Sequence, residues 1–306
     1  MASMGMDEAL RHRLQDLKGS ALSSWQRIER GYTAAQRWLL RFADGSSAFA
    51  KVGVTPLTAE FLLSEQRSYQ RLKAPFMPRL LGFDADPNCP LLLLEDLSAA
   101  RWPPPWQAGD IELFLRTMQQ VATTGPLPDD FPSLSEDYGA ACSAERCASG
   151  WGAVARDPSA FLGLGLCSAA WLSQALPRLQ EAQNDAVVEG DALVHNDVRS
   201  DNLCISADRG MLLIDWNLPR RGNARFDIAF AAPSICLEGG PLPEELVADD
   251  DGRLAAIVSG FFAGRAGLAQ IPDAPRVRWI QLQQLRMALP WVVRVLSLPP
   301  LDLPDP

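Results

Sequence analysis

The sequence predicts an α+β fold with two lobes, a small β-rich lobe followed by a larger, mostly helical one. Short apolar runs alternate with turn signals over the first hundred residues, whereas apolar side chains recur at helical spacing after about residue 110. The run Arg101-Trp-Pro-Pro-Pro-Trp is typical of a boundary between the two. The predicted division is 1–24 for an N-terminal helix or residues added for expression, 25–100 for the first lobe, 101–297 for the second and 298–306 for a tail.

Length, charge and composition exclude several classes of protein. A chain of 306 residues is long enough to bury a large core, and its net charge of -9 argues against nucleic acid or an anionic membrane as the main partner. The six cysteines form no CxxC pair, and two histidines are too few for a histidine-rich metal site. Because free thiols are typical of a reducing compartment and residues 1–20 do not resemble a signal peptide, we expect a cytoplasmic protein.

The first lobe opens with a predicted β-hairpin. Its strands are Trp38–Phe42 and Ala48–Val52, and Asp44-Gly45 between them is a strong hairpin-turn signal. Lys51 lies near the end of the second strand. Two further strands are predicted at 78–83 and 91–97.

A helix follows this hairpin, and it carries an acidic residue on its apolar face. Thr55-Pro56 is typical of an N-cap and first helical residue, and the helix should extend to about Lys73. Glu65 shares a stripe with apolar and aromatic side chains, namely Phe61, Tyr69 and Leu72. A carboxylate in that position must be paired or neutral, and Lys51 is its natural partner. The alternative for Lys51 is a solvated lysine on an edge strand.

The second lobe is predicted to be mostly helical. Helix-like periodicity covers four segments, Ile111–Ala122, Ala169–Asn184, Leu254–Gly267 and Val277–Leu296. Pro290 should kink or divide the last of these helices, because proline removes one backbone hydrogen bond.

The segment from His195 to Asn217 carries the most chemical information. It places Asp197, Asn202 and Asp215 around a short predicted hairpin whose turn is 207–210. Phosphoryl transfer from a magnesium nucleotide uses such a trio, with one carboxylate for the proton of the acceptor hydroxyl and an amide and a second carboxylate for the metal. In the expected register Asn202 faces Asp215, with Cβ atoms about 5 Å apart.

These residues resemble a known signature. His195-x-Asp197-x-x-x-x-Asn202, followed by Ile214-Asp215-Trp216, is similar to that of the aminoglycoside phosphotransferase and choline kinase group. The resemblance implies a protein-kinase-like fold and small-molecule kinase activity with Mg²⁺ and ATP, or GTP as the alternative. One residue departs from the pattern, since Asn196 stands where aminoglycoside kinases usually have glycine.

The same resemblance implies roles for further residues. Lys51 and Glu65 would position the nucleotide phosphates, and the Glu95-Asp96-Leu97 segment would meet the adenine through its backbone. Arg199 occupies the position at which protein kinases have a phosphate-binding lysine. It would either stabilise charge on the transferring phosphoryl group or be an ordinary surface arginine. Gly31-Tyr32-Thr33 resembles the loop that covers the nucleotide. Asp227 resembles an aspartate that braces the catalytic loop, and we expect His195 to be structural.

We therefore expect a phosphotransferase that acts on a hydroxylated small molecule, either an antibiotic such as an aminoglycoside or an amino-alcohol or sugar-like metabolite. A protein kinase and a non-catalytic nucleotide-binding protein are the alternatives. If acidic segments of the second lobe line the cleft, the acceptor should be cationic. The segments are Asp129-Asp130, Glu136-Asp137, Glu238, Glu244-Glu245 and Asp249-Asp250-Asp251, and Glu238 is the best candidate.

Overall fold

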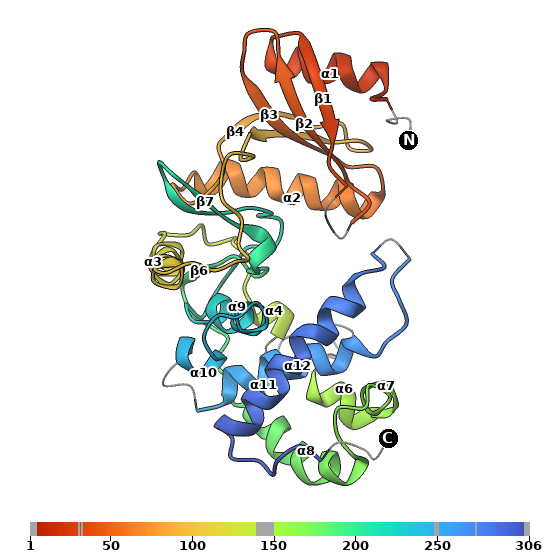
Figure 1. Ribbon diagram of the computed structural model, residues 1–306, viewed down its shortest axis with the longest axis vertical. Coiled ribbons are helices and arrows are strands. Elements are labelled where there is room, and N and C mark those ends of the chain that lie inside the picture. The colour runs from red at the N-terminus through yellow and green to blue at the C-terminus, as the bar shows by residue number, and fades with distance from the viewer. Residues whose placement is uncertain are drawn as a thin grey trace. The chain divides into compact units, whose positions relative to one another are not determined.

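The chain divides into two compact units. The structure is a computed structural model that describes residues 5–29, 31, 33–138, 150–247, 251–272 and 274–302. The first unit contains 1–101 and 204–218, and the second contains 102–203 and 219–306. One unit is built on an antiparallel sheet and the other is mostly helical, so the predicted α+β class is confirmed (Figure 1). The structure assigns residues 204–218, which the sequence-based division left with the larger lobe, to the first unit.

A five-stranded antiparallel sheet forms the first unit. Its spatial order is β1-β2-β3-β5-β4. The strands are β1 Leu22–Arg27, β2 Gln36–Phe42, β3 Ser47–Val52, β4 Leu80–Asp84 and β5 Leu91–Glu95. The predicted hairpin is β2–β3, and Gly45 in its turn adopts a left-handed φ of 82°, which glycine adopts without strain. Strand β1 escaped prediction because four of its six side chains are exposed and it lacks apolar alternation.

The two faces of the sheet have different partners. Helix α1 (Glu8–Lys18) packs its buried Leu10 and Leu14 against the face that carries Trp38, Leu40 and Ala50. Because side chains alternate along a strand, Lys51 points to the opposite face. Lys51 pairs in register with Leu92 at the centre of the sheet, which explains why this lysine is 4% exposed rather than solvated.

Helix α2 (Pro56–Leu72) supplies the partner for that second face. It begins as predicted, with the Thr55 side chain accepting the Thr58 N–H and Pro56 in the first turn. Glu65 and Tyr69 lie on its buried face, whereas Leu62 rather than Phe61 occupies the buried position one turn earlier. The first unit also contains most of the β7 (Leu203–Ser206) and β8 (Gly210–Leu213) hairpin. Gly210, which we expected in the turn, is the first residue of β8.

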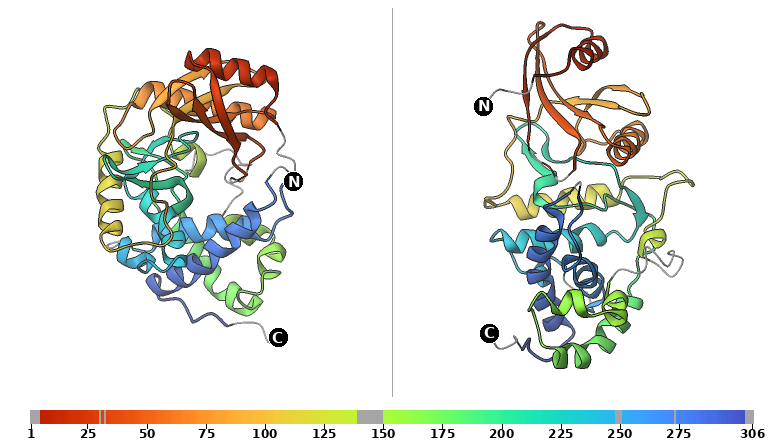
Figure 2. Two further views of the ribbon diagram at one scale, coloured as in Figure 1. Left: turned by 45° about the horizontal axis from the view of Figure 1, so that its top comes forward. Right: turned by 90° about the vertical axis from the view of Figure 1, so that its right-hand side faces the viewer.

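The second unit packs its helices around one large core. Trp151, Leu179, Phe226 and Trp291 contribute fully buried side chains to it. Helix α11 packs along α12, the blue pair in Figure 2. The helices are α3 Asp110–Ala122, α4 Ser135–Tyr138, α6 Trp151–Arg156, α7 Ser159–Leu162, α8 Ala169–Asn184, α9 Phe226–Leu237, α10 Pro243–Leu246, α11 Arg253–Ala266 and α12 Val277–Val295.

Three short elements of the second unit frame a loop. Strand β6 (Ala192–Val194) pairs antiparallel with β9 (Arg220–Gly222), and the 3-10 helix η1 covers Ser200–Asn202. The loop from His195 to Arg199 therefore starts at a paired strand and ends in a tight helical turn. Both short strands escaped prediction, because three residues are too few for a periodic pattern.

Two features of the C-terminal region differ from expectation. Helix α12 continues through Pro290 without dividing, and the flanking Leu289 and Trp291 are buried in the core that holds it in place. In the described part of the predicted tail, the Asp302 carboxylate accepts a hydrogen bond from the Ser168 hydroxyl at 2.6 Å, and the Pro299 carbonyl accepts one from Trp171 Nε1–H at 2.9 Å.

Within the described residues, every helix is too short or too polar to cross a membrane.

Candidate active site

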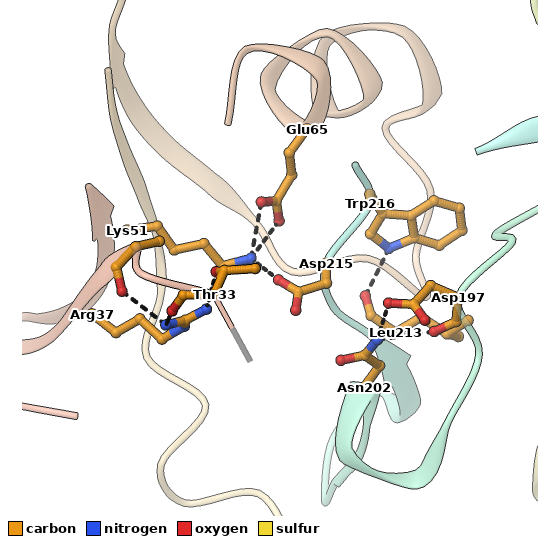
Figure 3. A network of polar contacts seen from close by, with 10 residues as sticks. Thr33, Arg37, Lys51, Glu65, Asp197, Asn202, Leu213, Asp215 and Trp216 are labelled. Atoms are coloured by element: carbon orange, nitrogen blue, oxygen red, sulfur yellow. Dashed lines mark hydrogen bonds and ion pairs between the residues drawn. The ribbon is translucent and has the colours of Figure 1, made fainter. Parts of the chain in front are cut away.

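A buried ion-pair cluster lies in the first unit (Figure 3). Lys51 on β3 donates to both carboxylate oxygens of Glu65 on α2, at 2.8 and 2.9 Å. The same ammonium donates to Oδ1 of Asp215, which lies two residues beyond β8. The predicted pairing of Lys51 with Glu65 is confirmed, and the contact with Asp215 is an addition that no sequence pattern indicated.

The charged groups of this cluster shift one another's pKa values. Burial disfavours the Lys51 ammonium, but the charges of Asp215 and Glu65 outweigh burial and raise the pKa of Lys51. Burial also raises the pKa of Glu65, while the charges of Lys51 and Arg37 oppose that shift. The Asp215 side chain is 31% exposed, so it is the member of the cluster that solvent reaches.

The turn that carries Asp215 is fixed by its neighbour. Trp216 is fully buried, packs against Phe76 with the two ring planes tilted by 31°, and donates its Nε1–H to the Leu213 carbonyl at 2.7 Å. Asp215 adopts a left-handed φ of 64°, a conformation that Asp and Asn tolerate better than most residues. Ser64 on α2 donates to the Asn217 carbonyl at 2.8 Å. The helix that carries Glu65 is thus bonded directly to the turn that carries Asp215.

Arg37, a residue that sequence reasoning did not single out, anchors Thr33 and Ala35 just before β2. The Arg37 guanidinium donates to the Ala35 carbonyl at 2.8 Å and to the Thr33 hydroxyl at 3.0 Å (Figure 3). Gly31 has a φ of 120°, and a Cβ there would lie 2.5 Å from the guanidinium carbon. Tyr32, the middle residue of the predicted nucleotide-covering loop, lies outside the described residues.

The predicted adenine segment has its side chains engaged within the first unit. The Glu95 carboxylate accepts the Arg79 N–H and Arg209 Nη1–H, both at 2.8 Å. The half-buried Leu97 accepts the Ala100 N–H at 3.0 Å through its carbonyl. The Glu95 N–H in turn donates to the Arg79 carbonyl at 3.0 Å. The contact of this segment with the adenine stays a prediction.

In the second unit, Asp227 holds the start of the loop. Its Oδ2 accepts the His195 N–H at 2.6 Å and its Oδ1 accepts the Asn196 N–H at 2.9 Å, as expected of a brace. Asn196 has a left-handed φ of 65°. That conformation explains the departure from the family pattern, because asparagine is among the few residues that replace glycine there at small cost.

Asp197 and Asn202 meet within this loop. The Asn202 side-chain NH₂ donates to the Asp197 carbonyl at 2.9 Å and to its Oδ2 at 3.1 Å (Figure 3). Arg199 lies 3.6 Å from Asp197 and 3.2 Å from Asp201, so it sits among carboxylates. The loop therefore presents a partly exposed carboxylate held by an amide on one side and a guanidinium on the other.

Each unit contains an oxygen donor of the kind that magnesium takes. In the second unit the NH₂ of Asn202 is committed to Asp197, so its amide oxygen is the atom left for a cation. In the first unit Asp215 offers a carboxylate that is 31% exposed. The described residues contain no cluster of three His, Cys, Asp or Glu that would hold a metal by themselves. Mg²⁺ is commonly held by only one or two protein oxygens together with nucleotide phosphates.

Most of the acidic segments proposed to attract a cation have local partners. Asp137 pairs with Arg220 at 2.7 Å, and Glu244 pairs with Arg294 at 2.5 Å. Glu238 accepts hydrogen bonds from the side chains of Trp106 and Ser200. Asp249 and Asp250 lie outside the described residues.

Comparison with known proteins agrees with this arrangement. The model of a phosphotransferase enzyme family matches residues 24–269. No curated protein sequence is similar enough to count as a match.

Several solved structures are similar over nearly the whole chain. A thermostable mutant of aminoglycoside phosphotransferase APH(4)-Ia, in ternary complex with AMP-PNP and hygromycin B, has a TM-score of 0.60 at 15% identity and covers 94% of this chain and 98% of its own. Spectinomycin phosphotransferase APH(9)-Ia, with ADP and spectinomycin, has a TM-score of 0.60 at 12% identity, covering 97% and 100%. A putative fructosamine-3-kinase from Thermobifida fusca YX-ER1 has a TM-score of 0.54 at 17% identity, covering 93% and 100%.

Asp227 should make stability depend on pH. Burial raises its pKa from 3.8 to about 7, although two N–H donors oppose the shift. Between about pH 4 and 7 the native state binds a proton that the unfolded state has released, so the free energy of unfolding falls as pH rises through this window. A pKa difference of about three corresponds to roughly 4 kcal/mol.

Urea unfolding of Asp227→Asn from pH 4 to 7.5 should show a smaller decline than the parent protein. Its stability at low pH should also be lower, because an amide offers only one oxygen to the two N–H groups. Asp191→Asn, at an exposed aspartate before β6, serves as the control. Identical pH slopes for the parent protein and Asp227→Asn would contradict the assignment.

Proposed function

The chain belongs to this phosphotransferase enzyme family and is a small-molecule kinase, and from that premise we propose that it transfers the γ-phosphoryl group of ATP to a hydroxyl group of a small acceptor. The observation that carries the proposal is the buried Lys51 ammonium bonded to both Glu65 and Asp215. In protein kinases the pairing of a strand lysine with a helix glutamate, together with a metal-binding aspartate, positions the nucleotide phosphates.

Lys51 and Glu65 are proposed to position the phosphates. Glu65 and Asp215 together engage the three N–H groups of the Lys51 ammonium, so a phosphate oxygen would share one of these donors. A pre-oriented ammonium loses little freedom when a phosphate oxygen binds. The backbone from Glu95 to Leu97 is proposed to contact the adenine, and a guanine base is the alternative.

Asn202 and Asp215 are proposed to hold Mg²⁺ through their side-chain oxygens. Magnesium, when bound, neutralises charge on the β- and γ-phosphates. The Asp215 side chain is 31% exposed, so a cation can reach its carboxylate. The NH₂ contacts to Asp197 keep the amide oxygen of Asn202 as the only atom that this side chain has left for a cation.

Asp197 is proposed to orient the acceptor hydroxyl and take its proton. Its carboxylate is 33% exposed, and the Asn202 amide fixes one of its oxygens. Arg199 is proposed to stabilise charge on the transferring phosphoryl group. Its guanidinium lies 3.6 Å from Asp197 and 3.2 Å from Asp201, which keeps it beside the proposed base.

The acceptor is proposed to be an aminoglycoside, an amino alcohol or a sugar-like metabolite. Two structural neighbours, which were solved in complex with hygromycin B and with spectinomycin, support this class. The net charge of -9 supports a cationic acceptor through long-range attraction. Because exposed charges are screened beyond about 8 Å at physiological salt, KM for such an acceptor should rise with ionic strength.

A substrate panel tests the proposal. ATP and GTP consumption with Mg²⁺ should be measured across aminoglycosides, spectinomycin, amino alcohols, fructosamine-type sugars and protein substrates. Turnover of a hydroxylated small molecule is expected, with mass spectrometry showing one added phosphate. Turnover of protein substrates alone, or nucleotide binding without any turnover, would overturn the proposal.

Asp197→Ala should remove most turnover and leave nucleotide binding intact. A positioned base typically contributes about 100- to 10,000-fold. Steady-state kinetics and calorimetric titration with ADP and Mg²⁺ measure the two properties. Asp201→Ala, which removes the other carboxylate beside Arg199, is the matched control and should retain activity. Near-normal turnover in Asp197→Ala would exclude this residue from the mechanism.

Asp215→Ala should lower both the rate and the affinity for the magnesium nucleotide. Metal-held charge is worth several kcal/mol in the transition state, so kcat should fall by roughly 100-fold or more. Titration with ADP should lose its dependence on Mg²⁺. The control is Asp208→Ala, an exposed aspartate of the same hairpin that bonds Ser206. Nucleotide affinity that still responds to Mg²⁺ as in the parent protein would refute the ligand assignment.

A further inference from the structure

Helix α9 contacts the Asp197 loop at both of its ends. At the first turn of the helix, Asp227 accepts the N–H groups of His195 and Asn196. At the other end, the C-cap residue Glu238 accepts a hydrogen bond from Ser200, in the 3-10 helix that closes the loop. Asp197 lies between these two attachment points in the sequence.

The contact at Glu238 is a small network with complementary donors. Its Oε1 accepts the Ser200 hydroxyl at 2.5 Å, and its Oε2 accepts Trp106 Nε1–H at 2.9 Å. Ser200 is 5% exposed, and both Glu238 and Trp106 are half-buried. Each carboxylate oxygen therefore has its own donor, and one side chain joins the loop to the segment before α3.

These contacts leave Glu238 poorly suited to be the acceptor ligand that its sequence context suggested. Burial and the nearby Asp201 raise the pKa of Glu238, whereas the bonds from Ser200 and Trp106 oppose the shift. Both oxygens already accept hydrogen bonds, and hydrogen bonds to a carboxylate are stronger than those between neutral groups. A cationic acceptor would have to compete with two internal donors.

We propose that Glu238 is a positioning residue for phosphoryl transfer, acting through Ser200 to hold the end of the loop that carries Asp197 and Asn202. The inference rests on the proposed function, because it is the geometry of those two residues that the brace would serve. Ser200 lies two residues before Asn202, so a shift of its hydroxyl moves the amide that holds the Asp197 carboxylate. Trp106 fixes the orientation of Glu238 in turn.

The role predicts a particular pattern of kinetics. Glu238→Ala should lower kcat by about 10- to 100-fold with little change in acceptor KM, because displacement of a reacting group by about 1 Å costs on this order. An acceptor ligand would show the opposite pattern, with a raised KM. Glu238→Gln should recover most of the lost turnover, since its amide can accept from Trp106 and donate to Ser200.

The connection through Ser200 is tested by a double variant. If Glu238 acts through this hydroxyl, Ser200→Ala combined with Glu238→Ala should be no slower than Glu238→Ala alone. Multiplying losses would mean that the two residues act separately, and the proposal would fail. Asp84→Ala is the matched control, because Asp84 is also a partly exposed carboxylate with two donors, Arg13 at 2.7 Å and the Asp86 N–H at 3.2 Å.

Hydrogen exchange provides a readout that needs no substrate. In the full-length protein, amides of residues 199–203 should exchange faster in Glu238→Ala than in the parent, and Asp84→Ala should leave them unchanged. Unchanged exchange would refute the brace even if turnover fell. If the parent protein transferred phosphate to no acceptor, the proposed function would fail, and exchange alone would still decide whether Glu238 holds the loop.

Discussion

The relative positions of β3, α2 and the turn after β8 in the first unit depend on one buried ammonium group, that of Lys51. Lys51 lies on the inner face of the sheet with 4% of its surface exposed, and an unpaired charge there would be very costly. Two carboxylates compensate it, one from α2 and one from the turn after β8. Because breaking a buried pair leaves the other charge without compensation, the strand, the helix and the turn must adopt their positions together. The geometry that we propose for phosphate binding is therefore also a condition of folding.

The loop of the second unit is organised in a different way, by backbone and neutral donors. Asp227 is buried and satisfies two N–H groups that a turn would otherwise leave without partners. Burial disfavours the ionised form of this carboxyl group and raises its pKa to about 7. The loop thus obtains a fixed shape from one helix, while its own exposed residues remain available for chemistry.

Sequence alone was sufficient to predict secondary-structure elements with a local periodic pattern. It also predicted an ion pair between side chains whose faces follow from the periods of a strand and a helix. The β2–β3 hairpin, the Thr55 cap of α2 and the Lys51–Glu65 pair all follow from periods of two and 3.6 combined with the cost of burying charge. The contact between Lys51 and Asp215 spans 164 residues, and that between Trp106 and Glu238 spans 132. No local pattern encodes such contacts, because they depend on how distant elements pack. Arg37 was overlooked for a related reason, since its partners are mainly backbone oxygens that carry no sequence signal.

The left-handed backbone at Asp215 affects how related sequences should be read. A φ of 64° admits glycine, asparagine and aspartate far more readily than other residues. A descendant that had abandoned catalysis would therefore still be held to this short list by the conformation of the turn alone. An aspartate at this position is therefore weaker evidence of enzymatic activity than its possible role as a metal ligand suggests. Lys51, whose burial is tolerable only while its carboxylate partners persist, is the more discriminating residue when active and inactive relatives are sorted.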